Sequence, residues 1–256
     1  LSRGLGDVYK RQTDDDLLLA LSEGMLQVGG AGDVDGDGDD ELFLSNMSFD
    51  LPTTYVIDDW TGGMPEITAV FRGQPQINDK IYELEEFALS TGVVVLDDPD
   101  GDGFNNMLVM GPLDGDSGRA YLLSQPVTES RDFSNPDESV RAWFVGEINE
   151  NLFGGGSQTG FDFNCDGDKD VLLTAPGYNL LDGEGEFILE EIGAVYGFDA
   201  SSKGTINADD ADMKLFGSYS ESHIEWAADL GDTNNDGCSD LGVSVSYTHL
   251  TLPTSG

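Results

Sequence analysis

Asp162-Phe163-Asn164-Cys165-Asp166-Gly167-Asp168-Lys169-Asp170 is an acidic loop around which the chain is organised, and Val171-Leu172-Leu173 follows it directly. Oxygen-bearing side chains stand at positions 1, 3, 5 and 9 of this loop, and a glycine stands at position 6. This alternation lets a tight turn direct several oxygens to one centre. A cation of calcium size needs such a cage, with about six to eight oxygen ligands at about 2.3–2.6 Å. Without a cation the carboxylates would repel one another, so we expect metal binding to help this segment fold.

The same loop occurs four times, beginning at residues 33, 98, 162 and 232, with spacings of 65, 64 and 70 residues. A long and nearly constant period predicts an array of similar structural units. We therefore expect up to four calcium ions, one in each loop. With the backbone carbonyl of position 7 included, the candidate ligands are Asp33, Asp35, Asp37, Asp39 and Glu41; Asp98, Asp100, Asp102, Phe104 and Asn106; Asp162, Asn164, Asp166, Asp168 and Asp170; and Asp232, Asn234, Asp236, Cys238 and Asp240.

Short apolar runs surround these loops and predict the strands of each unit. They are bounded by Gly, Pro or Ser, which favours strands over helices. Phe161 and Phe163 mark a weaker strand before the third loop. We expect irregular outer loops at 130–139 and 200–212, and a short helix at 79–87. The predicted strands lie at 42–44, 107–110, 171–173 and 241–243 after the loops, at 25–28, 93–96 and 224–228 before them, and at 55–57, 119–123 and 194–198 later in each unit.

An EF-hand is the strongest alternative for the acidic loops, since it shares the carboxylates at positions 1, 3 and 5 and the glycine at position 6. An EF-hand also needs a bidentate Glu at position 12 and flanking helices. Position 12 is apolar in all four loops and falls within a predicted strand, so we reject the EF-hand. The residues at position 12 are Leu44, Val109, Leu173 and Val243.

The overall composition limits the classes of partner. The 256 residues include 11 basic and 50 acidic side chains, for a net charge of −39, which disfavours nucleic acid and anionic membranes. A hydrophobic content of 38% with 34 glycines indicates a turn-rich all-β protein rather than a disordered acidic tail. No apolar run approaches the roughly 18–20 residues that would span a bilayer, so we expect no membrane insertion.

Two cysteines, Cys165 and Cys238, are too few for a disulfide scaffold. They are either two unrelated small residues or a bridge between neighbouring units, and the sequence leaves both open. The two ends of the chain resemble translated sequencing-adapter read-through, at residues 7–12 and 246–254. We therefore expect 1–13 and 246–256 to be non-native ends that flank a fragment of a larger protein, 14–245.

Further motifs recur around the loops. Phe153-Gly154 and Phe216-Gly217 precede the third and fourth loops. Met110-Gly111-Pro112 and Thr174-Ala175-Pro176 follow the second and third loops. Gly118-Arg119-Ala120-Tyr121 and Gly193-Ala194-Val195-Tyr196 match a later Gly-x-x-Tyr strand. Together with the acidic loops, these motifs resemble the FG-GAP repeats of the integrin α-chain β-propeller over about residues 16–245.

The resemblance implies an all-β fold: a partial propeller of about four blades, each a four-stranded antiparallel sheet with one calcium loop. It implies a non-catalytic, extracellular or cell-surface module that binds a protein partner, with calcium in a structural role. Two positions depart from the family's final Asp. Glu41 is longer, and Asn106 lacks a charge, so we expect the second site to bind calcium most weakly. Family propellers commonly have seven blades, which agrees with a fragment.

A carbohydrate-binding propeller, or an accessory domain of a carbohydrate-active enzyme, is the alternative function. Its candidate residues are Trp60 with Asp58 and Asp59, and Trp143 as a second aromatic. His223 is the only histidine outside the suspect C-terminal end, and no Ser or Cys partner can be assigned to it. We therefore predict a structural role for His223, no catalytic residue and no enzymatic activity.

Overall fold

The computed structural model describes residues 9–13, 16–20, 26–46, 53–58, 66–72, 93–96, 98, 101–111, 117–123, 131–132, 140–147, 152–156 and 160–245. Over these ranges the chain is all-β, as predicted, and the one helical element is a short 3-10 helix, η2 (Ala208–Asp210). None of the helical segments described is long and apolar enough to cross a membrane. The predicted helix at 79–87 and the C-terminal end 246–256 lie outside the described residues.

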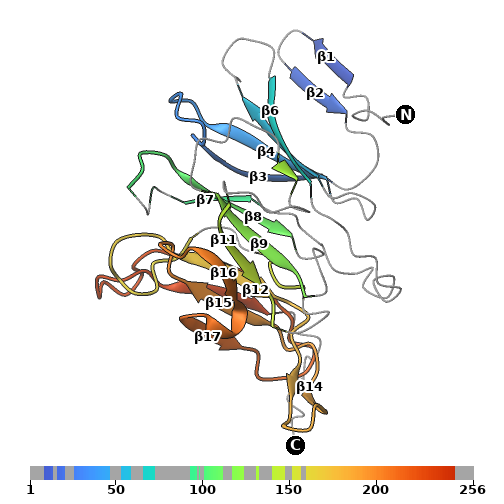
Figure 1. The fold of residues 1–256 in the computed structure, drawn as a ribbon, viewed down its shortest axis with the longest axis vertical. Coiled ribbons are helices and arrows are strands. Elements are labelled where there is room, and N and C mark those ends of the chain that lie inside the picture. The colour runs from blue at the N-terminus through green and yellow to red at the C-terminus, as the bar shows by residue number, and fades with distance from the viewer. Residues whose placement is uncertain are drawn as a thin grey trace, which may run out of the picture.

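Four sheets follow one another along the chain (Figure 1). The first contains β3 (Leu26–Gly32), β4 (Glu41–Asn46), β5 (Thr53–Asp58) and β6 (Glu66–Arg72) as an antiparallel meander. The second repeats it with β7 (Val93–Leu96), β8 (Asn106–Gly111), β9 (Arg119–Leu123) and β11 (Val140–Val145). The third contains β12 (Val171–Ala175), β15 (Ala194–Phe198) and β17 (Met213–Phe216), and the fourth contains β18 (Ile224–Asp229) and β19 (Leu241–Val245).

Two hairpins stand beside these sheets. One pairs β1 (Tyr9–Thr13), which lies within the expected non-native end, with β2 (Asp16–Ala20). The other pairs β13 (Leu180–Leu181) with β14 (Phe187–Leu189) and lies between β12 and β15. Its position agrees with the longer spacing, 70 residues, between the third and fourth acidic loops. Before the third loop, Phe161 forms only an isolated bridge with Asp170, which agrees with the weak strand predicted there.

The prediction that 130–139 and 200–212 are irregular loops is wrong in part, since each segment contributes a strand. β10 (Arg131–Asp132) pairs in parallel with β6, and β16 (Gly204–Asn207) pairs in parallel with β11. The first two sheets therefore have five strands each, not four. Each added strand covers the edge of the preceding sheet, whose backbone groups would otherwise lack partners. In β16 only Ile206 is partly buried, so an edge strand of this kind gives no apolar run to detect.

The sheets stack face to face, so the middle sheets are buried on both sides. In β8, Met107 and Val109 belong to the core shared with the first sheet, whereas Leu108 and Met110 belong to the core shared with the third. Leu172 of β12 packs with Ile224 of β18 in a third core. Successive strand residues point to opposite faces. This two-sided burial explains why the strands read as continuous apolar runs.

Glycines allow the first strands of successive sheets to approach closely. A Cβ built on Gly32 of β3 would lie 2.7 Å from Val95 Cγ1 of β7. One built on Gly160, next to the Phe161 bridge, would lie 2.5 Å from Leu96 Cδ2. Real Cβ atoms do not make such contacts, so these two positions require glycine. The stack therefore brings the inner edges of neighbouring sheets together.

Phe153 and Gly154 pack between the second sheet and the third. The buried ring of Phe153 packs edge-on against Tyr196 and Phe198, with centroids 5.4 and 6.3 Å apart. Gly154 has φ 83°, and a Cβ there would lie 2.8 Å from the Arg119 carbonyl oxygen. Phe216-Gly217 differs, since Phe216 is half-exposed and packs against Tyr178 with centroids 5.0 Å apart.

We predict that Phe144→Ala lowers the free energy of unfolding by about 3–5 kcal/mol, because it opens a cavity between the second and third sheets. The Phe144 ring is fully buried and lies 4.7 Å from the Phe198 ring. Phe187→Ala is the matched control: its ring is 61% exposed, so a change within about 0.5 kcal/mol is expected. Equal losses in urea denaturation would contradict the buried position of Phe144.

Candidate metal sites

The four acidic loops share one backbone conformation. Positions 4 and 6 have positive φ in every loop, a region that glycine adopts freely and Asn tolerates. At position 4, φ is 85° in Gly36, 69° in Gly101, 62° in Cys165 and 61° in Asn235. At position 6, φ is 98° in Gly38, 96° in Gly103, 99° in Gly167 and 96° in Gly237. The glycine at position 6, noted from the sequence, is thus required by the turn.

Each loop also hydrogen-bonds to its own carboxylates. The carboxylate at position 1 accepts the N–H of position 6, and the carboxylate at position 5 accepts the N–H of position 7. These bonds hold the side chains on the inside of the turn, as an Asx turn does. The first set is Gly38 to Asp33 (3.1 Å), Gly103 to Asp98 (2.9 Å), Gly167 to Asp162 (3.0 Å) and Gly237 to Asp232 (2.9 Å). The second set is Asp39 to Asp37 (2.9 Å), Phe104 to Asp102 (2.9 Å), Asp168 to Asp166 (2.9 Å) and Cys238 to Asp236 (3.0 Å).

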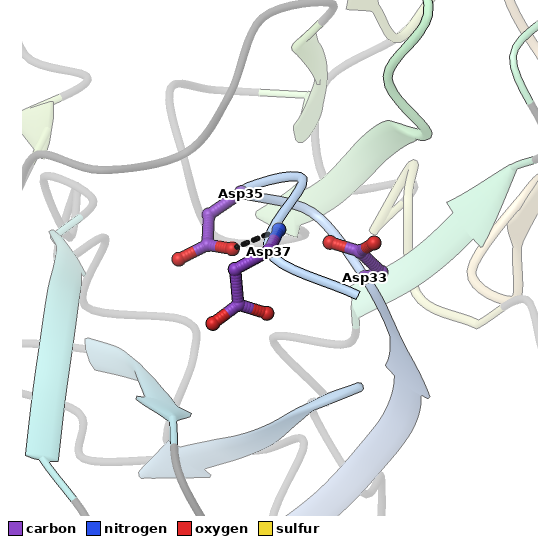
Figure 2. A group of neighbouring side chains, drawn as sticks. All are labelled: Asp33, Asp35 and Asp37. Atoms are coloured by element: carbon purple, nitrogen blue, oxygen red, sulfur yellow. Dashed lines mark hydrogen bonds between the residues drawn. The ribbon is translucent and has the colours of Figure 1, made fainter. Parts of the chain in front are cut away.

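Positions 1, 3 and 5 come together in the first loop. Carboxylate oxygens of Asp33, Asp35 and Asp37 all lie within 4.8 Å of one another, and the Asp37 N–H donates to Asp35 Oδ1 at 3.1 Å (Figure 2). Asn164 and Asn234 stand at position 3 of the third and fourth loops and accept the N–H of position 5 at 2.9 and 2.8 Å. Asp100, position 3 of the second loop, lies outside the described residues.

Position 9 ties the end of a loop to its beginning. Its carboxylate accepts the N–H of position 2 in three loops: Val34 to Glu41 Oε2 (2.7 Å), Phe163 to Asp170 Oδ2 (3.3 Å) and Thr233 to Asp240 Oδ2 (2.9 Å). The Thr233 hydroxyl also donates to Asp240 Oδ2, which lowers the pKa of that carboxyl. Glu41 and Asp170 are buried at the start of the following strand. The longer Glu41 therefore keeps the contact that Asp makes in the third and fourth loops.

The second loop lacks this contact for a reason visible in its sequence. Position 2 is Pro99, which has no N–H to donate. Position 9 is Asn106, which is 0% exposed, and neither its Oδ1 nor its Nδ2 has a hydrogen-bond partner within the described part of the chain. A buried amide without partners costs about 1–3 kcal/mol. A cation held by Asn106 Oδ1 would satisfy the oxygen, so this side chain points to a ligand in the loop.

The carboxyl group of Asp170 is costly to ionise at its place in the third loop. Burial raises its pKa to about 7, against the lowering effect of N–H groups from Ala200 and Phe163; Asp199 and Asp166 raise it further. The Ala200 N–H donates to Asp170 Oδ1 at 3.2 Å. A carboxylate that is this costly to ionise is one that a cation would stabilise.

Arg141 supports this arrangement from the neighbouring sheet. Its Nε and Nη2 donate to the carbonyl oxygens of Ser202 (3.2 Å) and Ser201 (3.0 Å), in the turn that presents Ala200 to Asp170. The pKa of Arg141 is lowered by its own burial, against the attraction of Asp199. The sequence did not indicate this role, because Arg141 contacts residues about 60 positions further along the chain.

A disulfide joins Cys165 of the third loop to Cys238 of the fourth, with Cα atoms 5.2 Å apart. The sequence left this pairing open. Cys238 was a candidate ligand through its backbone carbonyl, and the disulfide uses only its side chain. The bridge places the third and fourth loops side by side.

His223, Lys214 and Tyr196 are titratable residues outside the acidic loops, and each lies close to a Glu side chain. His223 Nε2 lies 3.4 Å from Glu191 Oε2, and its backbone N–H donates to the Glu191 carbonyl. Lys214 forms an ion pair with Glu147 at 2.9 Å and lies over the Tyr196 ring. Burial would lower the Lys214 pKa, but the bonds to Glu147 and Asp209 outweigh it and the net shift is upward. Burial, with Glu147, also raises the pKa of Tyr196.

Trp143, one aromatic of the alternative sugar site, packs edge-on against Tyr121, with ring centroids 5.0 Å apart. It is partly buried and packs against the core between the first and second sheets. Asp58 lies at the end of β5, whereas Asp59 and Trp60 lie outside the described residues. Oxygen donors in repeated turns are therefore the chemistry that the described structure presents.

A comparison with protein-family models and with curated protein sequences finds no match.

In metal-free protein, Asp170 should make stability fall as pH rises from about 4 to about 7. The unfolded carboxyl ionises near pH 4, but the folded one holds its proton to a pKa of about 7, so folding binds a proton in this window. Asp170→Asn should remove this slope from urea denaturation measured across the window in EDTA. Asp182→Asn is the control, because three N–H groups lower the Asp182 pKa. A slope unchanged by Asp170→Asn would contradict the assigned pKa.

Proposed function

We propose that this chain is a calcium-stabilised, non-catalytic β-propeller module in which each stacked sheet is a blade and each acidic loop holds one calcium ion. The observation that carries the proposal is the shared loop conformation, with positive φ at positions 4 and 6 in all four loops. A solvent-exposed Asp-Gly turn has no reason to repeat the same hydrogen bonds at the same place in every unit. A ligand common to the four loops supplies that reason.

The packing supports the propeller. Propellers place small antiparallel sheets around an axis, with each sheet buried between two neighbours. Here the first two sheets repeat one meander, successive sheets share apolar cores, and Gly32 and Gly160 let the inner strands converge. The parallel strands β10 and β16 link each unit to the edge of the preceding one. The FG-GAP resemblance agrees with this arrangement.

The donor set supports calcium. The candidate ligands are carboxylate, amide and carbonyl oxygens, which suit a hard cation. Positions 1, 3, 5 and 9 would hold the ion with the carbonyl of position 7. When bound, calcium would neutralise carboxylates that otherwise repel one another and would satisfy Asn106 Oδ1. The loops connect the first two strands of each unit, so the ion would stabilise each blade at its inner hairpin.

The proposed role is recognition of a protein partner at a cell surface or outside the cell. A disulfide is compatible with an oxidising compartment. Millimolar calcium outside cells would fill loops of modest affinity that cytosolic calcium would leave empty. The carbohydrate-binding alternative gains no support from Trp143, which is partly buried and packs against a core. Competable sugar binding on a glycan array would favour that alternative instead.

Calcium should raise the thermal unfolding temperature, and EDTA should reverse the rise, because a ligand of the folded state stabilises it by mass action. At a free concentration 100 times Kd, each filled site contributes about 2.7 kcal/mol. Magnesium at the same concentration should act more weakly, since it demands near-octahedral geometry and keeps its waters. Identical melting curves in calcium and in EDTA, measured by scanning calorimetry, would overturn the proposed function.

The second loop should bind calcium most weakly, and Asn106→Asp should tighten it by adding a negative ligand. The same change should destabilise the metal-free protein, because Pro99 cannot donate an N–H to the buried carboxylate. Isothermal titration with calcium and urea denaturation in EDTA measure the two effects. Asn106→Ala should weaken only the second site, and Asp166→Ala should cause the larger loss at the third. If Asn106→Asp left both affinity and metal-free stability unchanged, Asn106 would not be a ligand.

A further inference from the structure

At two of the three junctions between neighbouring acidic loops, position 4 of one loop contacts position 7 of the next. A Cβ built on Gly36, position 4 of the first loop, would lie 2.5 Å from Phe104 Cε1, position 7 of the second. Cys165, position 4 of the third loop, is bonded to Cys238, position 7 of the fourth. At the intervening junction a Cβ on Gly101 would have no described atom within 4 Å. The contact between position 4 and position 7 therefore occurs at two of the three junctions, once as packing and once as a covalent bond.

Both ends of the disulfide lie among candidate ligands. Cys165 stands between Asn164 and Asp166, whose side chains occupy positions 3 and 5. Cys238 would offer its own carbonyl, and its N–H donates to Asp236 Oδ1 at 3.0 Å. A displacement of either cysteine therefore displaces donor groups in its own loop, and the disulfide transmits that displacement to the other loop.

We propose that the Cys165–Cys238 disulfide couples the third and fourth cation sites, so that filling one strengthens binding at the other and reduction uncouples them. This inference rests on the proposed function. A cation that orders the fourth loop fixes Cys238 and, through the bond, Cys165. The third loop then loses less conformational freedom when it binds, which is positive cooperativity. Charge acts in the opposite direction, because a cation in one loop lowers the negative potential that attracts a second cation to the adjacent loop. This repulsion is present with and without the disulfide, so the difference between the oxidised and reduced protein measures the effect of the bond.

The local loop conformation does not depend on the disulfide. The first and second loops have the same positive φ values at positions 4 and 6 and contain no cysteine. Reduction should therefore leave each loop able to bind while removing the link. A dithiol supplies two electrons and two protons, the Sγ–Sγ bond breaks, two thiols form, and the dithiol closes into its own disulfide. The thiol–disulfide state would thus set how the third and fourth loops respond to calcium.

The experiment measures calcium affinity loop by loop in the full chain. The backbone amides of Gly167 and Gly237 report on the third and fourth loops in an NMR titration with calcium chloride. Asp236→Ala disables the fourth site. In the oxidised protein it should weaken binding at Gly167 at least about fivefold, the lower end of typical coupling between sites. In a Cys165→Ser/Cys238→Ser background, or in dithiothreitol, the same change should weaken it less than twofold.

Phe104→Ala is the matched control, since it removes the packing contact between the first two loops and should leave the coupling between Gly167 and Gly237 intact. Equal weakening at Gly167 in the oxidised protein and in the serine background would overturn the coupling and leave calcium binding standing. The dithiothreitol measurement keeps the test valid if the serine variant fails to fold. No calcium-dependent shift at either glycine would overturn the proposed function itself, and the coupling with it.

Discussion

Four short turns concentrate negative charge, and this charge limits how the chain around them can fold. Each turn holds its carboxylates inward through its own N–H groups, as in the bonds to Asp33 and Asp37. This geometry needs positive φ at position 6, and glycine supplies it in every loop. In the second and third loops, the turn then leads directly into a strand that is buried on both faces. Position 9 lies at this junction in both loops, where Asn106 and Asp170 are buried. The burial that favours packing of the strand therefore also makes a polar or charged side chain costly there.

The stacked sheets explain why these loops need support from one another. A single small sheet cannot bury two apolar faces, but neighbouring sheets cover each other in shared cores. The same stacking lines up the loops and brings Cys165 next to Cys238 and Gly36 next to Phe104. Contacts between units are thus made both in the cores and between the loops. Arg141 adds a third type, since it fixes a turn of the following sheet that donates to Asp170.

The local features of the fold could be predicted from the sequence, and the long-range ones could not. The strands β7, β9 and β15 lie where their apolar runs indicated, because burial on both faces leaves a continuous signal. β10 and β16 were missed because a short edge strand depends on a partner far away in the chain. The hairpin β13–β14 was missed because its strands have only two and three residues, although all of them are apolar. For the site, spacing identified the candidate ligand positions, whereas Arg141, Ala200 and the pairing of the cysteines follow only from three-dimensional contacts.

We propose that one kind of ligand accounts for the conformation that the four loops share. It would also account for the buried amide of Asn106, which has no hydrogen-bond partner among the described residues, in the loop that lacks a donor at Pro99. The most direct measurement is a crystal structure of the protein grown in calcium chloride, with anomalous diffraction used to locate the ions. We expect one anomalous peak inside each loop, with Asn106 Oδ1 among the ligands of the second. Loops that keep this conformation but show no anomalous peak, or peaks only at scattered surface carboxylates, would contradict the claim.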